Sequence, residues 1–316
     1  MYYLGIDLGG TNIACGIVNE NYEIIGRGRV KTNLPRPAAE IADDIFNASM
    51  MAIENAGVKK EDIKFAGIGS PGAIDAKNGI VSYANNLGFN NVPLKKLVEE
   101  RLNIETFIEN DANAAAYGEM LAGAGKGTKD FVAITLGTGV GGGVIIGGKI
   151  LSGYNSAGAE LGHTVINIDG EPCTCGRNGC WESYASATAL IRQTKREMLN
   201  NKNSLMWELT DGNIDNVNGI TAFDAMRQND ESGTAVVDNY IKYVAVGVVN
   251  MINIFQPQVL CIGGGISKEG DTLLNPIRAF AEKERYSKNI KVQTEVKAAE
   301  LGNDAGIIGA AFLGEL

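Results

Sequence analysis

Two stretches of the chain share a pattern that decides the predicted fold: residues 4–18, LGIDLGGTNIACGIV, and residues 132–146, VAITLGTGVGGGVII. Each stretch reads as an apolar strand, a glycine-rich turn and a second apolar strand. A supersecondary unit that recurs in this way indicates an internal duplication. The sequence therefore predicts two related lobes with a cleft between them.

Apolar periodicity and turn residues extend this interpretation along the chain. In the first half we expect, in chain order, the strands 3–9, 13–18 and 24–32, the helix 38–57, a strand and turn at 65–72, the helix 93–102, the strand 105–110 and the helix 111–123. After the repeated unit of the second half we expect the helix 234–255, the strands 258–265 and 290–296, and the helix 304–314. This alternation of strands and helices predicts an α/β fold.

The domain boundary is expected in residues 122–130, AGAGKGTKD, because a charged stretch with several glycines suits a hinge. A chain of 316 residues also exceeds what one hydrophobic core usually fills. We therefore expect an N-terminal lobe at 1–120, completed by the C-terminal helix of 303–316, and a C-terminal lobe at 121–302.

The composition narrows the class of protein and of partner. The chain has 45% hydrophobic and 21% charged residues, which is the composition of an ordinary soluble protein. The net charge of -9 disfavours nucleic acid and anionic membranes as partners, because both attract basic surfaces. No signal peptide pattern opens the chain, and the uncharged run 131–148 contains seven glycines, which disfavour a membrane span. We expect a cytoplasmic protein that binds small ligands.

The two glycine turns are candidate phosphate loops. Without side chains, the backbone N–H groups of Gly9, Gly10 and Asn12, and those of Gly137 and Gly139, can approach an anion closely, and the hydroxyl groups of Thr11 and Thr138 can add donors. Either loop alone could be a hairpin turn that needs glycine only for positive φ. Two matched loops favour phosphate binding.

The sequence lacks the full pattern of two other nucleotide-binding motifs. The run 137–142, GTGVGG, satisfies the dinucleotide fingerprint, but that fingerprint lies between a strand and a helix, and the residues after this run read as a strand. No Walker A sequence is present. ATP, if it binds, must bind in another way.

Polar side chains at strand ends supply candidate catalytic groups. Asp7 lies in the first glycine loop, where a carboxylate beside phosphates is useful if it holds Mg²⁺, although Asp also forms turns. Asn110 and Asp111 lie where a strand ends and a helix begins, a position that also suits an N-cap. A carboxylate there can accept the proton of an attacking hydroxyl, so Asp111 is the candidate base.

The only histidine, His163, precedes three of the five cysteines. One imidazole nitrogen and three thiolates, from His163, Cys173, Cys175 and Cys180, form the ligand set of a closed tetrahedral zinc site, which is structural because no position stays open. A disulfide pairing would leave an odd cysteine. Glu160 and Glu182 flank this loop and either face the cleft or lie on a solvated surface, while the second nitrogen of His163 can meet a substrate hydroxyl.

Several of these motifs together resemble the ROK family of sugar kinases, and most closely its bacterial glucokinases. They occur in one order along nearly the whole chain: GIDLGGTN, GIGSPG, ENDANAAAYGE, LGTGVGGG, AELGH, CTCGRNGCWE, IGGGIS and NDAGIIGAA. The resemblance implies a duplicated actin-like ATPase (ribonuclease H-like) fold, with two lobes that close over sugar and ATP, often in a homodimer.

The resemblance also implies a reaction and the residues that serve it. The γ-phosphoryl group of ATP is transferred to the 6-hydroxyl of a hexose, with Mg²⁺ as cofactor and Asp111 as base. The implied sugar contacts are Asn85, Asn110, Asp111, Glu160, His163 and Glu182. The glycine loops hold the phosphates, and Gly263, Gly264 and Gly265 lie near the nucleoside.

Three alternatives remain at this point. Glucose is the first expectation, but N-acetylmannosamine, N-acetylglucosamine, mannose and fructose share most of its hydroxyl positions. The family also includes sugar-responsive repressors, which carry a helix-turn-helix segment before the kinase-like body. Here the first phosphate strand begins by Leu4, so we do not expect such a segment. The third alternative is a non-catalytic sugar sensor.

Overall fold

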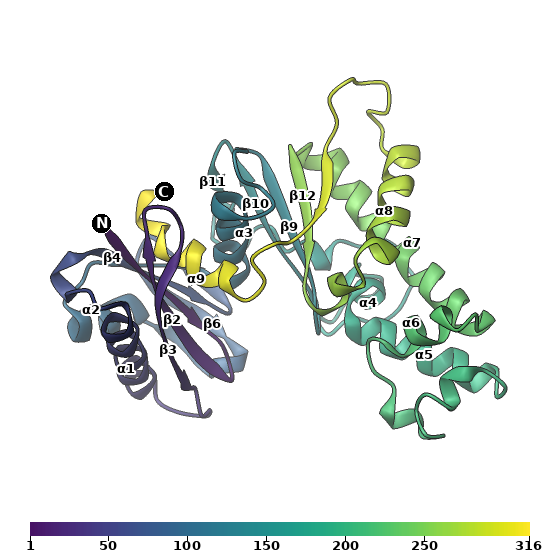
Figure 1. Cartoon of the computed structure of the whole chain (residues 1–316), viewed down its shortest axis with the longest axis horizontal. Helices are drawn as coiled ribbons and strands as arrows, with labels where there is room; N and C mark the ends of the chain where they lie inside the picture. Colours follow the sequence, from purple (N-terminus) through teal and green to yellow (C-terminus); the bar gives the residue numbers. More distant parts are fainter. The chain divides into compact units, whose positions relative to one another are not determined.

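The computed structural model describes all 316 residues, in two compact units. Unit 1 comprises Met1–Phe131, Gly143–Ala159 and Glu300–Leu316, and unit 2 comprises Val132–Gly142 and Glu160–Ala299. The sequence placed the first boundary slightly earlier, at 120/121, and assigned 143–159 to the second lobe. The C-terminal segment belongs to the same unit as the N-terminus, and Figure 1 shows its yellow helix beside the N-terminal strands.

The first sheet brings three strand ends to one edge. Its order is β3-β2-β1-β4-β8, with bounds Ile24–Lys31 (β3), Asn12–Asn19 (β2), Tyr2–Leu8 (β1), Ile63–Ser70 (β4) and Thr106–Asn110 (β8). The first three strands are antiparallel, whereas β1, β4 and β8 run parallel. The carboxyl ends of parallel strands meet at the same edge, where ligands bind in open α/β sheets.

Helices cover this sheet through close contacts. They are α1 (Ala38–Ala56), α2 (Leu94–Leu102), α3 (Asp111–Ala122) and α9 (Asp304–Ala311). The buried face of α1 includes Ile41, Ile45 and Ala48, and the helix ends at Gly57, which has a φ of 65°. Gly28 of β3 lets α1 approach, because a Cβ there would come within 1.9 Å of the Ala48 carbonyl oxygen.

A small antiparallel sheet between β4 and α2 was not predicted from the sequence. It consists of β5 (Ala73–Asp75), β6 (Ile80–Ala84) and β7 (Phe89–Val92), in that order. Its strands are short and partly exposed, so they lack the sustained apolar alternation by which a strand is identified. This sheet leads into the turn that contains Asn85.

The second sheet repeats the order of the first, which confirms the predicted duplication. It is β11-β10-β9-β12-β13, with bounds Lys149–Ile150 (β11), Val140–Ile146 (β10), Phe131–Leu136 (β9), Val259–Gly263 (β12) and Glu295–Ala298 (β13). The predicted strand at 290–296 therefore begins too early. Ile290 and Val292 are exposed, and pairing with β12 begins only at Glu295.

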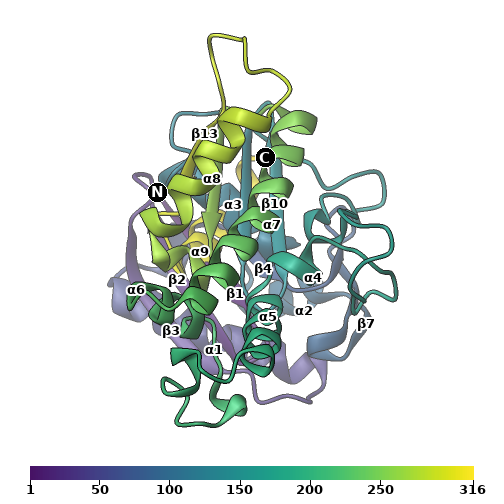
Figure 2. The same cartoon turned by 90° about the vertical axis from the view of Figure 1, so that its right-hand side faces the viewer.

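Unit 2 also contains the helices α4 (Glu182–Ala185), α5 (Ala187–Asn200), α6 (Thr221–Arg227), α7 (Glu231–Phe255) and α8 (Asp271–Glu284). Figure 2 shows α7 beside α8. The helix α7 is long and apolar enough to cross a membrane, but 61% of its most apolar window is buried in the protein, as in the core helix of a soluble protein. Short 3₁₀ helices lie at Lys60–Asp62, Asn85–Leu87, Leu161–His163, Leu205–Trp207, Ile214–Asn216, Gly265–Glu269 and Leu313–Glu315.

Candidate active site

The edge of the first sheet brings Asp7 and Asp111 close together. Asp7, near the end of β1, pairs with Gly69 of β4, and Gly69 pairs with Glu109 of β8. Asp111 begins α3 directly after β8, and a Cβ on Gly69 would lie 3.5 Å from the Asp111 Cα. The glycine therefore leaves room for the first turn of α3 over the strand ends.

Asn110 is the N-cap of α3. Its Oδ1 accepts hydrogen bonds from the backbone N–H groups of Ala112 (2.9 Å) and Asn113 (3.2 Å), and its Nδ2 donates to the Gly72 carbonyl (3.1 Å). Asn110 is therefore the residue that acts as the N-cap. Of the N–H groups of Ala112 and Asn113, the Asp111 carboxylate accepts a hydrogen bond only from that of Ala112. Because a neighbour supplies the cap, Asp111 keeps oxygen lone pairs for a ligand.

The carboxyl groups of Asp7 and Asp111 repel each other in a partly buried space. Burial raises the pKa of Asp7 to about 6, and the Asp111 carboxylate adds to this shift. Burial also raises the pKa of Asp111, against the lowering effect of the Ala112 N–H. Two such carboxylates favour a cation between them, and carboxylate oxygens are ligands that Mg²⁺ prefers. Their chemistry therefore fits a magnesium ion.

The first glycine loop is fixed at its base and open at its tip. The Gly9 N–H donates to the Asn12 carbonyl (2.9 Å), and Thr32 contributes two bonds, from its hydroxyl to the Gly9 carbonyl (2.7 Å) and from its N–H to the Thr11 carbonyl (3.0 Å). Neither Gly9 nor Gly10 has positive φ, and a Cβ on Gly10 would meet nothing closer than 3.9 Å. Gly10 therefore faces open space, whereas a Cβ on Gly9 would lie 3.0 Å from the Asn12 carbonyl oxygen.

In the second glycine loop, Gly137 is open in the same way as Gly10. Gly137 and Gly139 lack positive φ, and a Cβ on Gly137 would meet no atom within 4 Å. The N-terminus of α5 fixes the loop, because the Ala187 N–H donates to the Gly137 carbonyl and the Thr188 hydroxyl to the Thr138 carbonyl, both at 2.8 Å. The strand β10 follows the loop, so the dinucleotide fingerprint lacks its helix, as predicted.

The four predicted zinc ligands lie together. Ligand atoms of His163, Cys173, Cys175 and Cys180 are all within 4.8 Å of one another. The Cys173 Sγ is 3.7 Å from the His163 Nδ1, and the Cys175 and Cys180 sulfurs are 3.6 Å apart. Two ligands of one tetrahedral zinc ion are separated by roughly 3.5 to 3.8 Å, so the donor set and its spacing fit zinc.

The Glu182 carboxylate connects the cysteine cluster to the second glycine loop. Its Oε2 accepts a hydrogen bond from the Val140 N–H (2.9 Å), and its Oε1 lies 3.9 Å from the Cys173 Sγ. A Cβ on Gly139 would come within 2.3 Å of Oε2. Glu182 is therefore not free on a solvated surface, whereas Glu160 is exposed, at the start of the 3₁₀ helix that contains His163.

The remaining predicted residues lie in turns. Asn85 is exposed directly after β6, where its Oδ1 can accept from the Tyr83 hydroxyl (3.4 Å). A Cβ on Gly10 would lie 3.9 Å from the Cβ of the neighbouring Asn86. Gly264 follows β12 with a φ of 90°, and a Cβ on Gly265 would meet only open space. The site residues thus form two groups, one within each unit: Asp7, Gly9, Gly10, Thr11, Asn12, Asn85, Asn110 and Asp111 in unit 1; Gly137, Thr138, Gly139, Glu160, His163, Cys173, Cys175, Cys180, Glu182, Gly263, Gly264 and Gly265 in unit 2.

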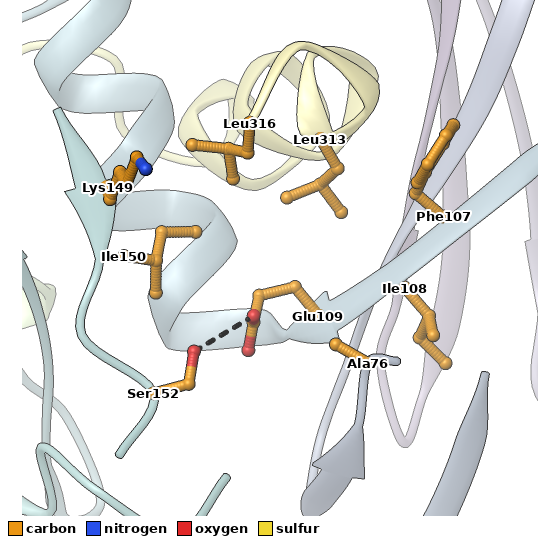
Figure 3. A pocket seen from close by; sticks show the side chains of 9 residues that line it. All are labelled: Ala76, Phe107, Ile108, Glu109, Lys149, Ile150, Ser152, Leu313 and Leu316. Carbon is orange, nitrogen blue, oxygen red and sulfur yellow. Dashed lines mark hydrogen bonds between the residues drawn. The ribbon is translucent and has the colours of Figure 1, made fainter. Parts of the chain in front are cut away.

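Glu109 is a buried carboxylate two residues before the candidate base, and the sequence did not single it out. Its exposed fraction is 7%, its Oε1 accepts from the Asn110 N–H (2.8 Å) and the Asn113 side chain (3.0 Å), and its Oε2 accepts from the Ser152 hydroxyl (3.3 Å). It lines a cavity of about 290 Å³ in unit 1 (Figure 3). The only sequence signal was an acidic residue in an apolar strand, two residues before the candidate base.

The repeated sheet order, with a glycine loop between the first two strands of each repeat, defines an α/β protein with the actin-like ATPase fold. Residues 3–315 match the ROK family, and the chain belongs to this family. It is 38% identical over 316 residues to the glucokinase of Halalkalibacterium halodurans, covering 99% of this chain and 94% of that protein.

Two further comparisons bear on function. A crystal structure of a ROK family glucokinase from Streptomyces griseus in complex with glucose and AMPPNP has a TM-score of 0.80 and 38% identity, with 99% of each chain covered. The xylose repressor of Bacillus subtilis is 29% identical over 321 residues, covering 99% of this chain and 76% of that protein.

Proposed function

We propose that this protein is a sugar kinase that transfers the γ-phosphoryl group of ATP to the 6-hydroxyl of glucose. The observation that carries the proposal is the pair of partly buried carboxylates, Asp7 and Asp111, beside an open glycine loop. The 38% identity to a glucokinase and to a structure with glucose and AMPPNP supports the choice of sugar and nucleotide.

Asp111 would act as the general base. Its raised pKa makes its carboxylate a stronger proton acceptor, and the capping by Asn110 holds the first turn of α3 in place. Once the sugar hydroxyl lies within hydrogen-bond reach, the carboxylate accepts its proton as the oxygen attacks phosphorus. The orientation of the hydroxyl toward phosphorus supplies much of the rate.

Asp7 would hold Mg²⁺, directly or through water, and the two glycine loops would bind the phosphates. When bound, the ion neutralises negative charge on the phosphoryl oxygens. The N–H groups of both loops and the hydroxyls of Thr11 and Thr138 donate to the same oxygens. Gly263, Gly264 and Gly265 would lie near the nucleoside.

The sugar would be bound by hydrogen-bonding side chains from both units. Asn85 and Asn110 belong to unit 1, while Glu160, His163 and Glu182 belong to unit 2. In the cluster the His163 Nδ1 faces Cys173, so the Nε2 is the nitrogen left for a sugar hydroxyl. We take the two units as the two lobes that close on the substrates.

A structural zinc ion would hold the loop that carries His163 and Glu182. The Arg177 N–H lowers the pKa of Cys175 to about 6, which favours the thiolate that binds zinc, whereas burial raises the pKa of Cys180 to about 11. Four protein ligands leave no open position for catalysis. We also propose a cytoplasmic homodimer with neither nucleic acid nor membrane as partner, on the family resemblance and the net charge of -9.

The replacement Cys175→Ser should release zinc and weaken glucose binding more than nucleotide binding, because the loop carries sugar ligands. Metal analysis should give about one zinc per wild-type chain and less in the variant. The matched control is Cys15→Ser, whose thiol is buried in unit 1 beside Ser49. Equal losses of affinity for both substrates would show that the cluster supports the whole fold instead.

Two alanine variants of the second glycine loop should each raise the KM for a different substrate. In Gly139→Ala the added methyl group would displace the Glu182 carboxylate, so the KM for glucose should rise by about tenfold, the loss of one good hydrogen bond to a charged group. In Gly137→Ala the methyl group meets only open space, where the phosphates are proposed, so the KM for ATP should rise instead. Steady-state kinetics with each substrate varied separates the two, and identical profiles would contradict these assignments.

A sugar-responsive regulator is the second candidate function, favoured by the match to the xylose repressor. A coupled assay of ADP release, with and without glucose, mannose, N-acetylmannosamine, N-acetylglucosamine and fructose, separates enzyme from sensor. We expect sugar-dependent ADP release with the highest kcat/KM for glucose. If none of these hexoses stimulates ADP release, the kinase function is wrong and the sugar-responsive regulator is the remaining candidate.

A further inference from the structure

Glu119 is a buried carboxylate to which the proposed reaction assigns no role. It lies on α3, about two turns beyond Asp111, with an exposed fraction of 3%. Its Oε1 accepts hydrogen bonds from the N–H groups of Glu300 (3.0 Å) and Leu301 (2.8 Å). Its Oε2 accepts from the N–H groups of Ala124 (3.0 Å) and Glu300 (3.1 Å).

The same residue organises the turn that ends α3. The Glu119 backbone carbonyl accepts from the N–H groups of Gly123 (3.1 Å) and Gly125 (2.9 Å). A Cβ on Gly123 would come within 2.1 Å of the Glu119 Oε2. The glycine at 123 therefore leaves the space that the carboxylate occupies.

Glu119 holds two of the four segments through which the chain passes between the units. Ala124 belongs to the segment that first leaves unit 1, after Phe131, and Glu300 is the first residue of the segment that finally returns to it. In Figure 1 the returning segment, in yellow, leads into α9, which packs on α3. Glu119 thus ties the outgoing and the returning segment to the helix that begins with Asp111.

Stability alone is a weak explanation for this carboxylate. A buried charge is costly unless it is fully hydrogen-bonded, and apolar residues often serve stability as well. The packing of α3 on α9 already depends on glycine, because a Cβ on Gly118 would lie 2.1 Å from the Ala305 carbonyl oxygen and one on Gly309 1.7 Å from that of Ala114. What the carboxylate adds is a fixed position for two backbone segments.

We propose that Glu119 is a positioning residue for phosphoryl transfer, which fixes the pivot about which the two units close on their substrates. The inference rests on the proposed kinase function. One end of α3 carries the base and the other holds two of the four connections to unit 2, so α3 relates the closing motion to the position of Asp111. Loss of the carboxylate contacts would leave the substrates bound but poorly aligned.

Two variants disturb the same contacts in different ways. Glu119→Gln keeps the shape but replaces one acceptor oxygen by an NH₂ group, which cannot accept a hydrogen bond. Gly123→Ala keeps the carboxylate and displaces it. In both we expect kcat to fall by about 10- to 100-fold with much smaller changes in the KM for glucose and ATP, since misalignment of about 1 Å costs up to this much. The compaction seen by small-angle X-ray scattering on adding glucose and AMPPNP should also be altered.

The control is Thr106→Val, which removes the buried hydrogen bond from Thr106 to the Ile104 carbonyl, at the end of β8 away from Asn110. It should lower the Tm without changing kcat. The effects of Glu119→Gln and Gly123→Ala on kcat should not add in the double variant, because both act on one contact. If either variant folds and keeps the wild-type kcat and scattering change, with only a lower Tm, the inference is wrong. Absence of glucose phosphorylation in the wild type would instead refute the proposed function.

Discussion

The Asp111→Asn variant should lose about 10² to 10⁴ in kcat while glucose and ATP still bind, because removal of a general base typically costs this much. The asparagine oxygen can still accept the Ala112 N–H, so the start of α3 should keep its structure. What the variant lacks is a group that takes the proton of the sugar hydroxyl. Coupled ADP-release kinetics would give kcat, and calorimetry would give the two affinities.

A matched control for this variant is Asp43→Asn, which removes an exposed carboxylate from the same unit. Asp43 pairs with Arg101 at the surface, and exposed ion pairs contribute little to stability. The control should retain wild-type kcat. Near-normal turnover in Asp111→Asn would refute the assignment of the base.

The second large effect is expected for Asp7→Asn, which should abolish most turnover and yet stabilise the protein without ligands. Burial and the Asp111 carboxylate raise the pKa of Asp7 to about 6, so its ionised form is disfavoured in the folded state. At about 1.4 kcal/mol per pKa unit, the neutral side chain should add up to about 3 kcal/mol of stability near pH 7.5. The loss of a carboxylate that holds Mg²⁺ should lower kcat by about 10² or more.

The stability difference between Asp7→Asn and the wild type should depend on pH in a direction set by the raised pKa of Asp7. A carboxyl group whose pKa is raised on folding destabilises the folded state increasingly as the pH rises from its unfolded value of 3.8 to about 6. The stability advantage of Asp7→Asn should therefore be small at pH 4 and fully developed above pH 6. Thermal unfolding without Mg²⁺ across this range would measure it. A variant that is less stable than the wild type at pH 7.5 would contradict the prediction.

Much of the fold could be predicted because its signals are local. The repeated strand–turn–strand units gave the duplication, and the apolar face of α1 together with Gly57 gave that helix almost to the residue. The strands β5 to β7 were not predicted, because each has only three to five residues, partly exposed, and so shows no clear alternation of apolar and polar side chains. The start of β13 depends on pairing with β12, a partner far away in the sequence.

The candidate site was likewise predictable from the sequence only in part. The cysteine and histidine spacing predicted a cluster whose ligand atoms do lie together. The sequence could not decide which residue caps α3, because Asn110 and Asp111 both suit that position and only side-chain geometry assigns it to Asn110. Glu119 could not be recognised, because its partners Glu300 and Leu301 are 181 and 182 residues away.

A crystal structure of the wild-type protein with glucose and a non-hydrolysable ATP analogue tests the central claim most directly, through the distance from the Asp111 carboxylate to the glucose 6-hydroxyl. We expect about 2.6 to 3.2 Å, with the γ-phosphate between the two glycine loops and in line with that hydroxyl. A 6-hydroxyl out of reach of Asp111, or a triphosphate that contacts neither loop, would contradict the account.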